Sequence, residues 1–287
     1  ISEIAQILRV ESLLSGSILF VGDQARISLQ MMDANSGLML WSQSYEANQQ
    51  DLFEMISIQS DIAKHVAQAL ETEIDQAEQI QISTIPTHSF EAYRYNLAAK
   101  VAHFNLDFQQ EWELSKLAIT LDPTYFDALY TYSSVNTVLI AIPLPGMTSK
   151  DHFTKALATA EKMIEVAPAK SEGYSLKALA MATNKDWEAV SGLINHLVQM
   201  GTPVSDLKYV ALLLMCLGDF EKAIEIYHAN LITEPLNLFG RGFLMAALEL
   251  SGNREQARRE YAIGEELSQL WWGDTVNILL ALGRHEA

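Results

Sequence analysis

Near the start of the chain, hydrophobic and polar positions alternate with a period of two. The clearest stretch is RISLQM, in which Ile27, Leu29 and Met31 alternate with polar side chains. Gly22 and Gly37 separate three such stretches, and glycine adopts the positive φ of tight turns without strain. This pattern predicts three strands joined in a β-meander, at residues 13–21, 25–33 and 38–46.

The hydrophobic spacing then changes to that of a helix. Between residue 51 and about residue 74, apolar side chains recur at helical spacing, namely Leu52, Phe53, Ile56, Ile62, Val66 and Leu70. Trp41 and Tyr45 lie on one face of the third predicted strand. Aromatic rings placed in this way usually cover a packed helix, so we expect both to pack against this one. The alternative is that they form the wall of a ligand site.

The second part of the chain repeats itself. Residues 79–91 come before it; they are mostly polar and include Pro86, so they are predicted to form a linker. Three residues then recur after a step of 34, the length of a tetratricopeptide repeat (TPR): Gly218, Ala223 and Tyr227 return as Gly252, Ala257 and Tyr261. Small residues such as alanine let paired helices approach closely, and stacked pairs bury a shared core.

These patterns together predict the organisation of the chain. We expect an α+β N-terminal subdomain, a three-stranded β-meander with flanking helices, over residues 1–78. An all-α TPR solenoid is expected over residues 92–287. Its five repeats are predicted at 92–125, 126–169, 170–203, 204–237 and 238–271, followed by a capping helix at 274–283. The second repeat is longer because AIPLPGMTSKD, with two prolines and a glycine, is inserted as a loop.

The first helix of each repeat is expected to line the concave side of the solenoid. The residues that this places in a groove are Tyr93, Asn96, Lys100, Phe104, Tyr130, Tyr174, Lys208 and Phe239. Aromatic side chains are favoured anchors in peptide grooves, so we predict that the groove binds a peptide, a protein or a small effector. The alternative is that these rings pack between helices. A receptor for chaperone tails is not expected, because Leu212 follows Lys208 where such a clamp has asparagine.

The composition of the chain makes some classes of function unexpected. Acidic residues outnumber basic ones 36 to 19, which gives a net charge of −17. Such a surface repels phosphate backbones and anionic lipid, so direct binding to nucleic acid is not expected. The longest apolar stretches fall far short of the ~20 residues of a spanning helix, so no membrane segment is expected. With 49% hydrophobic residues, the chain can bury a sizeable core.

The sequence contains no motif for catalysis or cofactor binding. It has no phosphate-binding glycine loop, no H-E-x-x-H, no G-x-S-x-G and no CxxC. Its seven histidines are scattered singly, without metal-ligand spacing. The single cysteine, Cys216, lies in an apolar segment and is expected to be an inert, buried thiol. We therefore expect no catalytic residue, no cofactor and no metal, and a protein that is not an enzyme.

Several motifs in the first third of the chain resemble a TolB-like α/β domain. They are the LSGS entry, RISLQMMDA, GLMLWS, and DLF followed by QSDIA. The later stretch IPTHSFEAYRYNLAA is similar to the start of the repeats that follow such domains. The resemblance covers residues 1 to about 75 and corresponds to the second half of the domain, with ISEIAQILRV as its second helix.

This resemblance implies a function. TolB-like domains occur in bacterial CadC-like membrane-bound transcriptional regulators and beside some nucleotide cyclases. The resemblance therefore implies a non-catalytic sensor and protein-interaction region of a CadC-like regulator, on the periplasmic face of the inner membrane. The alternative is a cytoplasmic TPR scaffold associated with a nucleotide cyclase.

The first predicted strand would lie at an edge of the sheet. Residues 13–21 carry no charge and no proline, the features that discourage an edge strand from pairing with another chain. We therefore expect a homodimer in which this strand pairs with its copy.

Overall fold

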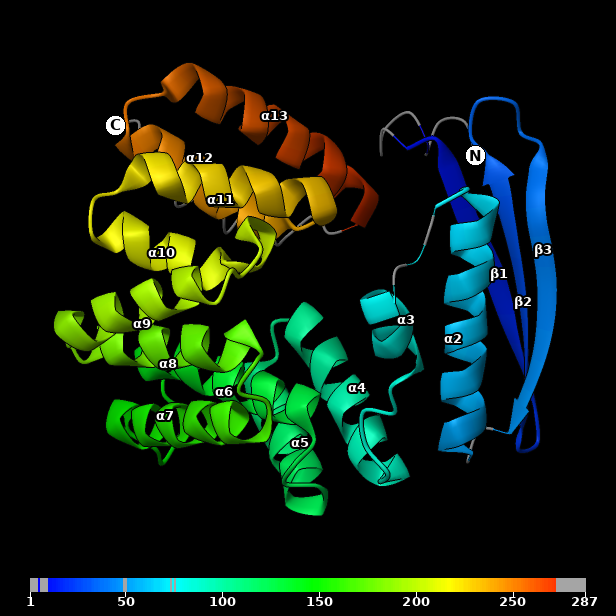
Figure 1. Cartoon of the computed structure of the whole chain (residues 1–287), viewed down its shortest axis with the longest axis horizontal. Helices are drawn as coiled ribbons and strands as arrows, with labels where there is room; N and C mark the ends of the chain where they lie inside the picture. Colours follow the sequence, from blue (N-terminus) through cyan, green and yellow to red (C-terminus); the bar gives the residue numbers. More distant parts are fainter. Residues whose placement is uncertain (1–4, 6–9, 49–50, 73, 75, 272–287) are drawn as a thin grey trace. The chain divides into compact units, whose positions relative to one another are not determined.

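A computed structural model of the chain describes residues 5, 10–48, 51–72, 74 and 76–271 (Figure 1). The chain divides into two compact units, residues 1–93 and residues 94–287. The domain boundaries expected at residues 78 and 92 stay a prediction. The expected capping helix at 274–283 lies outside the described residues.

The first unit contains the β-meander. Strands β1 (Ser12–Val21), β2 (Gln24–Asp33) and β3 (Met39–Asn48) pair antiparallel in the order β1-β2-β3 (Figure 1). Gly22 and Gly37 have φ angles of 61° and 70°, the left-handed conformation that their turns require. The prediction of three strands is confirmed, and each strand begins within one residue of its expected start.

One face of this sheet carries polar cross-strand pairs. A guanidinium nitrogen of Arg26 on β2 lies 2.6 Å from a carboxylate oxygen of Glu46 on β3. In the neighbouring pair on the same face, the hydroxyl oxygens of Ser28 and Ser44 are 3.1 Å apart. Polar cross-strand pairs of this kind stabilise a face that meets water.

Helix α2 (Leu52–Ala69) packs on the opposite face of the sheet. Trp41 stacks on the imidazole of His65, with ring centroids 5.7 Å apart, and the hydroxyl of Tyr45 lies 3.4 Å from its Nδ1. The interpretation of Trp41 and Tyr45 as packing residues is confirmed. The helix ends before residue 74, where it was expected to end, because Glu71 leaves the helical conformation with a φ of 53°.

Strand β1 carries exposed apolar side chains. Leu14, Ile18 and Phe20 are 47%, 59% and 62% exposed, although the strand register places them on the same face of the sheet as Trp41 and Tyr45. Because β1 lies at the edge of the described sheet, its outer N–H and C=O groups are not used in that sheet.

The segment expected to be a linker contains a helix, α3 (Gln76–Ser83). The hydroxyl of Ser60, on α2, donates to the carbonyl of Ile82 over 2.7 Å. The hydroxyls of Ser83 and Thr84 donate to carbonyls in the preceding turn, over 2.7 Å in each case. Residues 79–83 of the predicted linker thus belong to a short polar helix, in which side-chain hydroxyls bond backbone carbonyls.

The rest of the described chain is an array of paired helices (Figure 1). They are α4 (Phe90–Phe104), α5 (Phe108–Leu121), α6 (Phe126–Ala141), α7 (Ser149–Val166), α8 (Ser171–Thr183), α9 (Trp187–Gln199), α10 (Lys208–Cys216), α11 (Phe220–Thr233), α12 (Leu238–Leu250) and α13 (Arg254–Trp271). A short 3₁₀ turn, η1 (Val204–Asp206), precedes α10. These helices form five consecutive pairs, one in each predicted repeat.

The same local signals recur from repeat to repeat. An aspartate accepts a backbone N–H at the start of the second helix in three repeats, namely Asp107, Asp186 and Asp219. Gly218 and Gly252 have φ angles of 84° and 86° in the turns between paired helices. Ala223 and Ala257 are 0% and 4% exposed, so the small residues of the repeat lie at helix contacts, as predicted.

The insertion in the second repeat forms the connection between α6 and α7. His152, 0% exposed, lies under it. The N–H of Leu144 donates to Nε2 of this imidazole over 3.4 Å, so its Nδ1 carries the proton and donates to Oδ1 of Asn136 over 2.9 Å. The indole N–H of Trp112 donates to the same oxygen over 3.1 Å. A neutral histidine therefore ties the inserted loop to α5 and α6.

Candidate protein-interaction face

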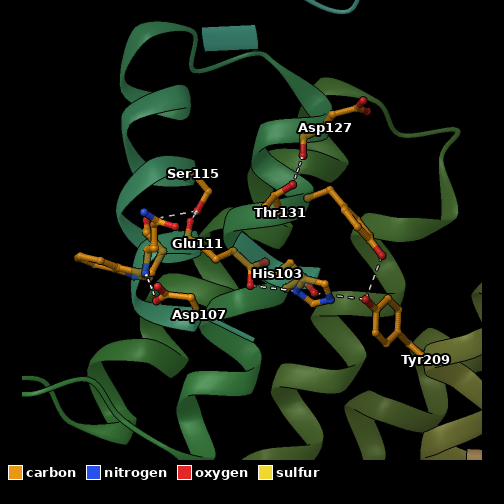
Figure 2. Close-up of polar contacts among 11 residues, drawn as sticks. His103, Asp107, Glu111, Ser115, Asp127, Thr131 and Tyr209 are labelled. Carbon is orange, nitrogen blue, oxygen red and sulfur yellow. Dashed lines mark hydrogen bonds and ion pairs between the residues drawn. The ribbon is translucent and has the colours of Figure 1, made fainter. Parts of the chain in front are cut away.

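The first helices of successive repeats pack side by side: α6 contacts α8, α8 contacts α10, and α10 contacts α12. We term the surface that they share with α4 the inner face. Figure 2 shows polar contacts around it. The residues that define it are Lys100, His103, Phe104, Asp127, Tyr130, Ser134, Lys208, Tyr209 and Phe239.

Two tyrosines join first helices that are not neighbours. The hydroxyl oxygens of Tyr130 on α6 and Tyr209 on α10 lie 2.9 Å apart, and Ser134 Oγ lies 3.3 Å from the hydroxyl of Tyr209. Burial raises the pKa of Tyr130, and the neighbouring Tyr209 raises it further, so the hydroxyl stays neutral. Helix α8 packs between α6 and α10, yet the two tyrosines reach each other past it. The array is therefore concave on the side of its first helices.

His103 and Glu111 form an ion pair inside the first repeat (Figure 2). Nδ1 of His103 lies 2.9 Å from a carboxylate oxygen of Glu111, and the two side chains are 39% and 2% exposed. The hydrogen bond with Glu111 raises the pKa of His103, against burial and the positive charge of Lys208. Burial raises the pKa of Glu111, against the hydrogen bond with His103. The pair therefore holds protons more tightly than the two free groups would.

The ring of His103 also meets the last repeat. Its centroid lies 6.3 Å from that of Phe239 on α12 and 6.4 Å from that of Phe104. Since α4 belongs to the first repeat and α12 to the fifth, the array brings its two ends together at His103. Phe104 and Phe239 remain 62% and 41% exposed, so aromatic surface from both ends is open at this point.

The cations of the inner face differ in their partners. Nζ of Lys100 lies 3.7 Å from a carboxylate oxygen of Asp127, and His103 pairs with Glu111. Within the described part of the chain, no carboxylate oxygen lies within 4.0 Å of Nζ of Lys208. Its positive charge acts to lower the pKa of His103, against the hydrogen bond with Glu111, and its Nζ lies 5.9 Å from the ring centroid of Tyr209. The carboxylates of Glu172 and Glu234 also act on Tyr130 and raise its pKa, so the inner face carries charges of both signs.

Most of the predicted groove residues meet on the inner face. The structure brings together Lys100, Phe104, Tyr130, Lys208 and Phe239. Tyr130 uses its hydroxyl within the face, whereas Phe104 and Phe239 keep exposed ring surface. That these five side chains bind a partner stays a prediction.

Three predicted groove residues were wrong. Asn96 is 0% exposed and donates to the hydroxyl of Tyr125 over 3.1 Å. Tyr174 packs inside its own repeat, with its ring centroid 4.6 Å from that of His196 on α9. Tyr93 is 6% exposed, and its hydroxyl accepts a hydrogen bond from the amide of Gln59 within the first unit. For Tyr93 and Tyr174, the packing alternative is the correct one.

Sequence reasoning missed Glu111 and Tyr209. A signal existed for Glu111, because it begins a buried stripe that continues at helical spacing with Ser115 and Ala118. A carboxylate on the core side of a helix requires a partner. Tyr209 gave no comparable signal, because its partner Tyr130 lies 79 residues away in sequence.

Aromatic rings, hydroxyls and charged side chains line the inner face. Across the described ranges, no group of three or more His, Cys, Asp or Glu side chains is placed to hold a metal ion. No helix among the described residues has the length and apolar character to cross a bilayer. Cys216 is exposed, so the expectation of a buried thiol was wrong. The groups on the inner face that a ligand can contact are exposed aromatic rings, a pair of hydroxyls and an ammonium group.

Comparison with known sequences gives one distant relative. No family model matches the chain. It is 23% identical over 185 residues to a protein named putative adenylate cyclase 3 from Rhizobium meliloti (strain 1021). The match covers 63% of this chain and 31% of that protein, so the chain spans less than a third of the length of this relative.

Solved structures similar to part of the chain include TPR proteins. TTC0263, a thermophilic TPR protein from Thermus thermophilus, is 14% identical, with 69% of this chain and 97% of that one covered and a TM-score of 0.46. YrrB, described as a TPR protein with an unusual peptide-binding site, is 14% identical, with 67% and 92% covered and a TM-score of 0.37. MamA is 17% identical, with 62% and 92% covered and a TM-score of 0.36. At such scores, the description of this array as TPR-like rests on its own five helix pairs and its 34-residue step.

Proposed function

We propose that this chain is a non-catalytic protein-interaction region whose inner face binds a peptide or a segment of a protein. The observation that carries the proposal is the meeting of Phe104 and Phe239 around His103. These two rings come from the first and fifth repeats, both contact the imidazole, and are 62% and 41% exposed. Exposed aromatic side chains that converge from separate elements are favoured anchors for a partner.

The inner face is a better candidate than other exposed apolar positions of the array. Ile232 on α11 is 82% exposed, but scattered single apolar residues are normal on protein surfaces. The inner face combines aromatic surface with the hydroxyls of Tyr130 and Tyr209 and with the ammonium group of Lys208. A partner bound there could satisfy polar and apolar contacts together, which is what gives an interface its specificity.

We further propose that the parent protein works in bacterial signalling, in one of two settings. The TolB-like motifs of the first third favour a CadC-like transcriptional regulator, with this region in the periplasm. The likeness to putative adenylate cyclase 3 favours a cytoplasmic scaffold associated with a nucleotide cyclase. An alkaline phosphatase fusion to the end of the parent protein separates the settings, because this reporter is active only after export. An active fusion supports the first setting, and an inactive one supports the second.

Peptide selection tests the binding function directly. Random peptides displayed on phage are selected on the wild-type chain, and the enriched sequences are synthesised with a fluorophore for anisotropy titrations. Phe104→Ser and Phe239→Ser should each weaken binding about tenfold, because each removes a central aromatic anchor. Ile232→Ser is the matched control, since it removes an exposed apolar side chain from α11, a second helix.

The proposal fails if selection enriches no binder, or if the enriched peptides bind both inner-face variants as tightly as the wild type. An equal loss in Ile232→Ser would also count against it, because the inner face would then have no special role. Circular dichroism of each variant verifies that the helices are intact before binding is measured.

A further inference from the structure

We propose that residues 275–283 of this chain bind its own inner face, across Phe104 and Phe239, and compete there with the partner. This inference rests on the proposed function, because it names a regulator of the same face. Its basis is an exposed apolar stripe on α4, together with the place at which the chain leaves α13.

Helix α4 exposes an apolar stripe along one side. Leu97, Val101 and Phe104 are 40%, 59% and 62% exposed, and residues three and four positions apart form one continuous strip on a helix. The opposite side of the helix is buried, at Ala99 and Ala102. The first helix of a repeat array has no preceding repeat to pack against, so its outer side must be polar or covered. This stripe is not polar, and a segment that covers it is therefore expected.

The chain leaves the last described helix close to α4. Arg241 on α12 pairs with Glu260 on α13, and a Cβ atom added at Gly264 would lie 3.5 Å from Cδ of the same arginine. The seven residues of α13 that follow extend about 10 Å further, past the start of α12. Phe239, in the first turn of α12, contacts His103 on α4. The segment after α13 consequently begins at the end of the array where α4 and α12 meet.

This segment has the composition and the length to cover the stripe. Residues 275–283 (TVNILLALG) lie outside the described residues. They contain no charged side chain, and five of the nine are Val, Ile or Leu, so they are stabilised by burial against apolar surface. From Leu97 to Phe104 the stripe is about 10 Å long, and nine residues span about 14 Å even when helical. The segment can therefore cover the stripe and still reach Phe239.

Binding of the segment changes the affinity for a partner. Phe104 and Phe239 are the anchors of the proposed function, so a segment that covers them excludes the partner. The affinity for the partner is then reduced by the fraction of molecules whose inner face is open. A face that is open in about a tenth of the molecules binds about tenfold more weakly than one that is always open.

Photocrosslinking identifies what the segment contacts. The photoreactive residue p-benzoylphenylalanine replaces Leu280 in the full chain, the protein is irradiated in dilute solution, and the crosslinked peptides are identified by mass spectrometry. We expect crosslinks within one molecule to peptides that contain residues 97–104 or 239–243. The same photoreactive residue in place of Ile232, an exposed position on α11, is the matched control and should not reach these peptides.

A double variant, Leu279→Gln with Leu280→Gln, tests the competition. It makes the segment more polar without adding charge, and it should tighten the binding of the phage-selected peptides about threefold or more, because more molecules then have an open face. Ile232→Gln is the control, since it makes the same kind of change at an exposed position away from the inner face, and it should leave the affinity unchanged.

Crosslinks that stay within α13, or that form only between two copies of the chain, would overturn the inference. An unchanged affinity in the double variant would also overturn it, as would an equal gain in Ile232→Gln. The proposed function is judged separately. If the selected peptides bind through Phe104 and Phe239 but the double variant binds them no more tightly, the function stands and only this inference falls. If residue 280 crosslinks to the inner face but no selected peptide binds there, the contact stands and the proposed function falls.

Discussion

The ion pair between His103 and Glu111 predicts how stability changes with pH. Both groups have raised pKa values in the folded chain, so the native state binds more protons here than the unfolded state does. Linkage then requires the free energy of unfolding to fall as pH rises. The fall begins near pH 4.5, the ordinary pKa of a glutamate side chain. It ends above pH 6.5, the ordinary pKa of a histidine side chain. The contribution of the pair is thus present at acid pH and lost as pH rises through the pKa of His103.

Glu111→Gln isolates this contribution, because glutamine keeps the shape and a carbonyl acceptor for Nδ1 of His103 but does not titrate. A hydrogen bond to a charged group contributes about 1.5–3 kcal/mol and a neutral one about 0.5–1.5 kcal/mol. Since the imidazole is 39% exposed, water screens part of the difference. We therefore expect a loss of about 1 kcal/mol at pH 6. At pH 9 the wild-type imidazole is neutral and the buried carboxylate is costly, so the loss should vanish or change sign.

Urea unfolding followed by far-ultraviolet circular dichroism, at pH 6 and pH 9 in one salt concentration, measures both values. Glu113→Gln is the control, because Glu113 is an exposed acid on the same helix. Its effect should be small at both pH values. A loss for Glu111→Gln that is the same at pH 6 and pH 9 would show that the carboxylate does not share a proton with His103. A similar loss for Glu113→Gln would trace the effect to helix α5 as a whole.

Three other predictions test the rest of the fold. Ala223→Leu should lower the free energy of unfolding by about 1–3 kcal/mol through overpacking and so lower the melting temperature. Ala246→Leu is the control, because Ala246 lies at an exposed site on α12, and it should leave the melting temperature unchanged. Equal melting temperatures of the two variants would contradict the repeat register. Burial lowers the pKa of His152, so the contribution of this residue to stability should fall as pH drops below 6.5. His152→Leu should cost about 1–3 kcal/mol at pH 7, because the N–H of Leu144 loses its acceptor, and should cost less at pH 5. Urea unfolding of wild type and variant at pH 5 and pH 7 measures both differences, and an equal loss at the two pH values would contradict the prediction. We also expect the chain to form a dimer through β1 that Ile18→Lys converts to a monomer, and a wild-type monomer in light scattering coupled to size exclusion would refute this.

The strands and repeats were predictable because their signals are local. A period of two with glycine turns marks each strand, and the 34-residue step with aligned alanines and glycines marks each helix pair. Helix α3 was missed because part of its stabilisation comes from Ser60, more than twenty residues earlier, whose hydroxyl bonds the carbonyl of Ile82. The polar composition of residues 76–89 gave no hint of this partner. A bond between distant residues has no counterpart in the periodicity of either segment.

The inner face shows the same division between local and distant information. The helical register predicted Phe104 and Phe239 on one side of the first helices, because that choice depends only on the repeat that contains each residue. That both rings meet His103 depends instead on the rotation between successive repeats, summed from the first to the fifth. A small change in the packing of any middle pair, such as the longer second repeat, alters that sum. The inner face is consequently a property of how all five repeats stack and not only of the side chains that line it.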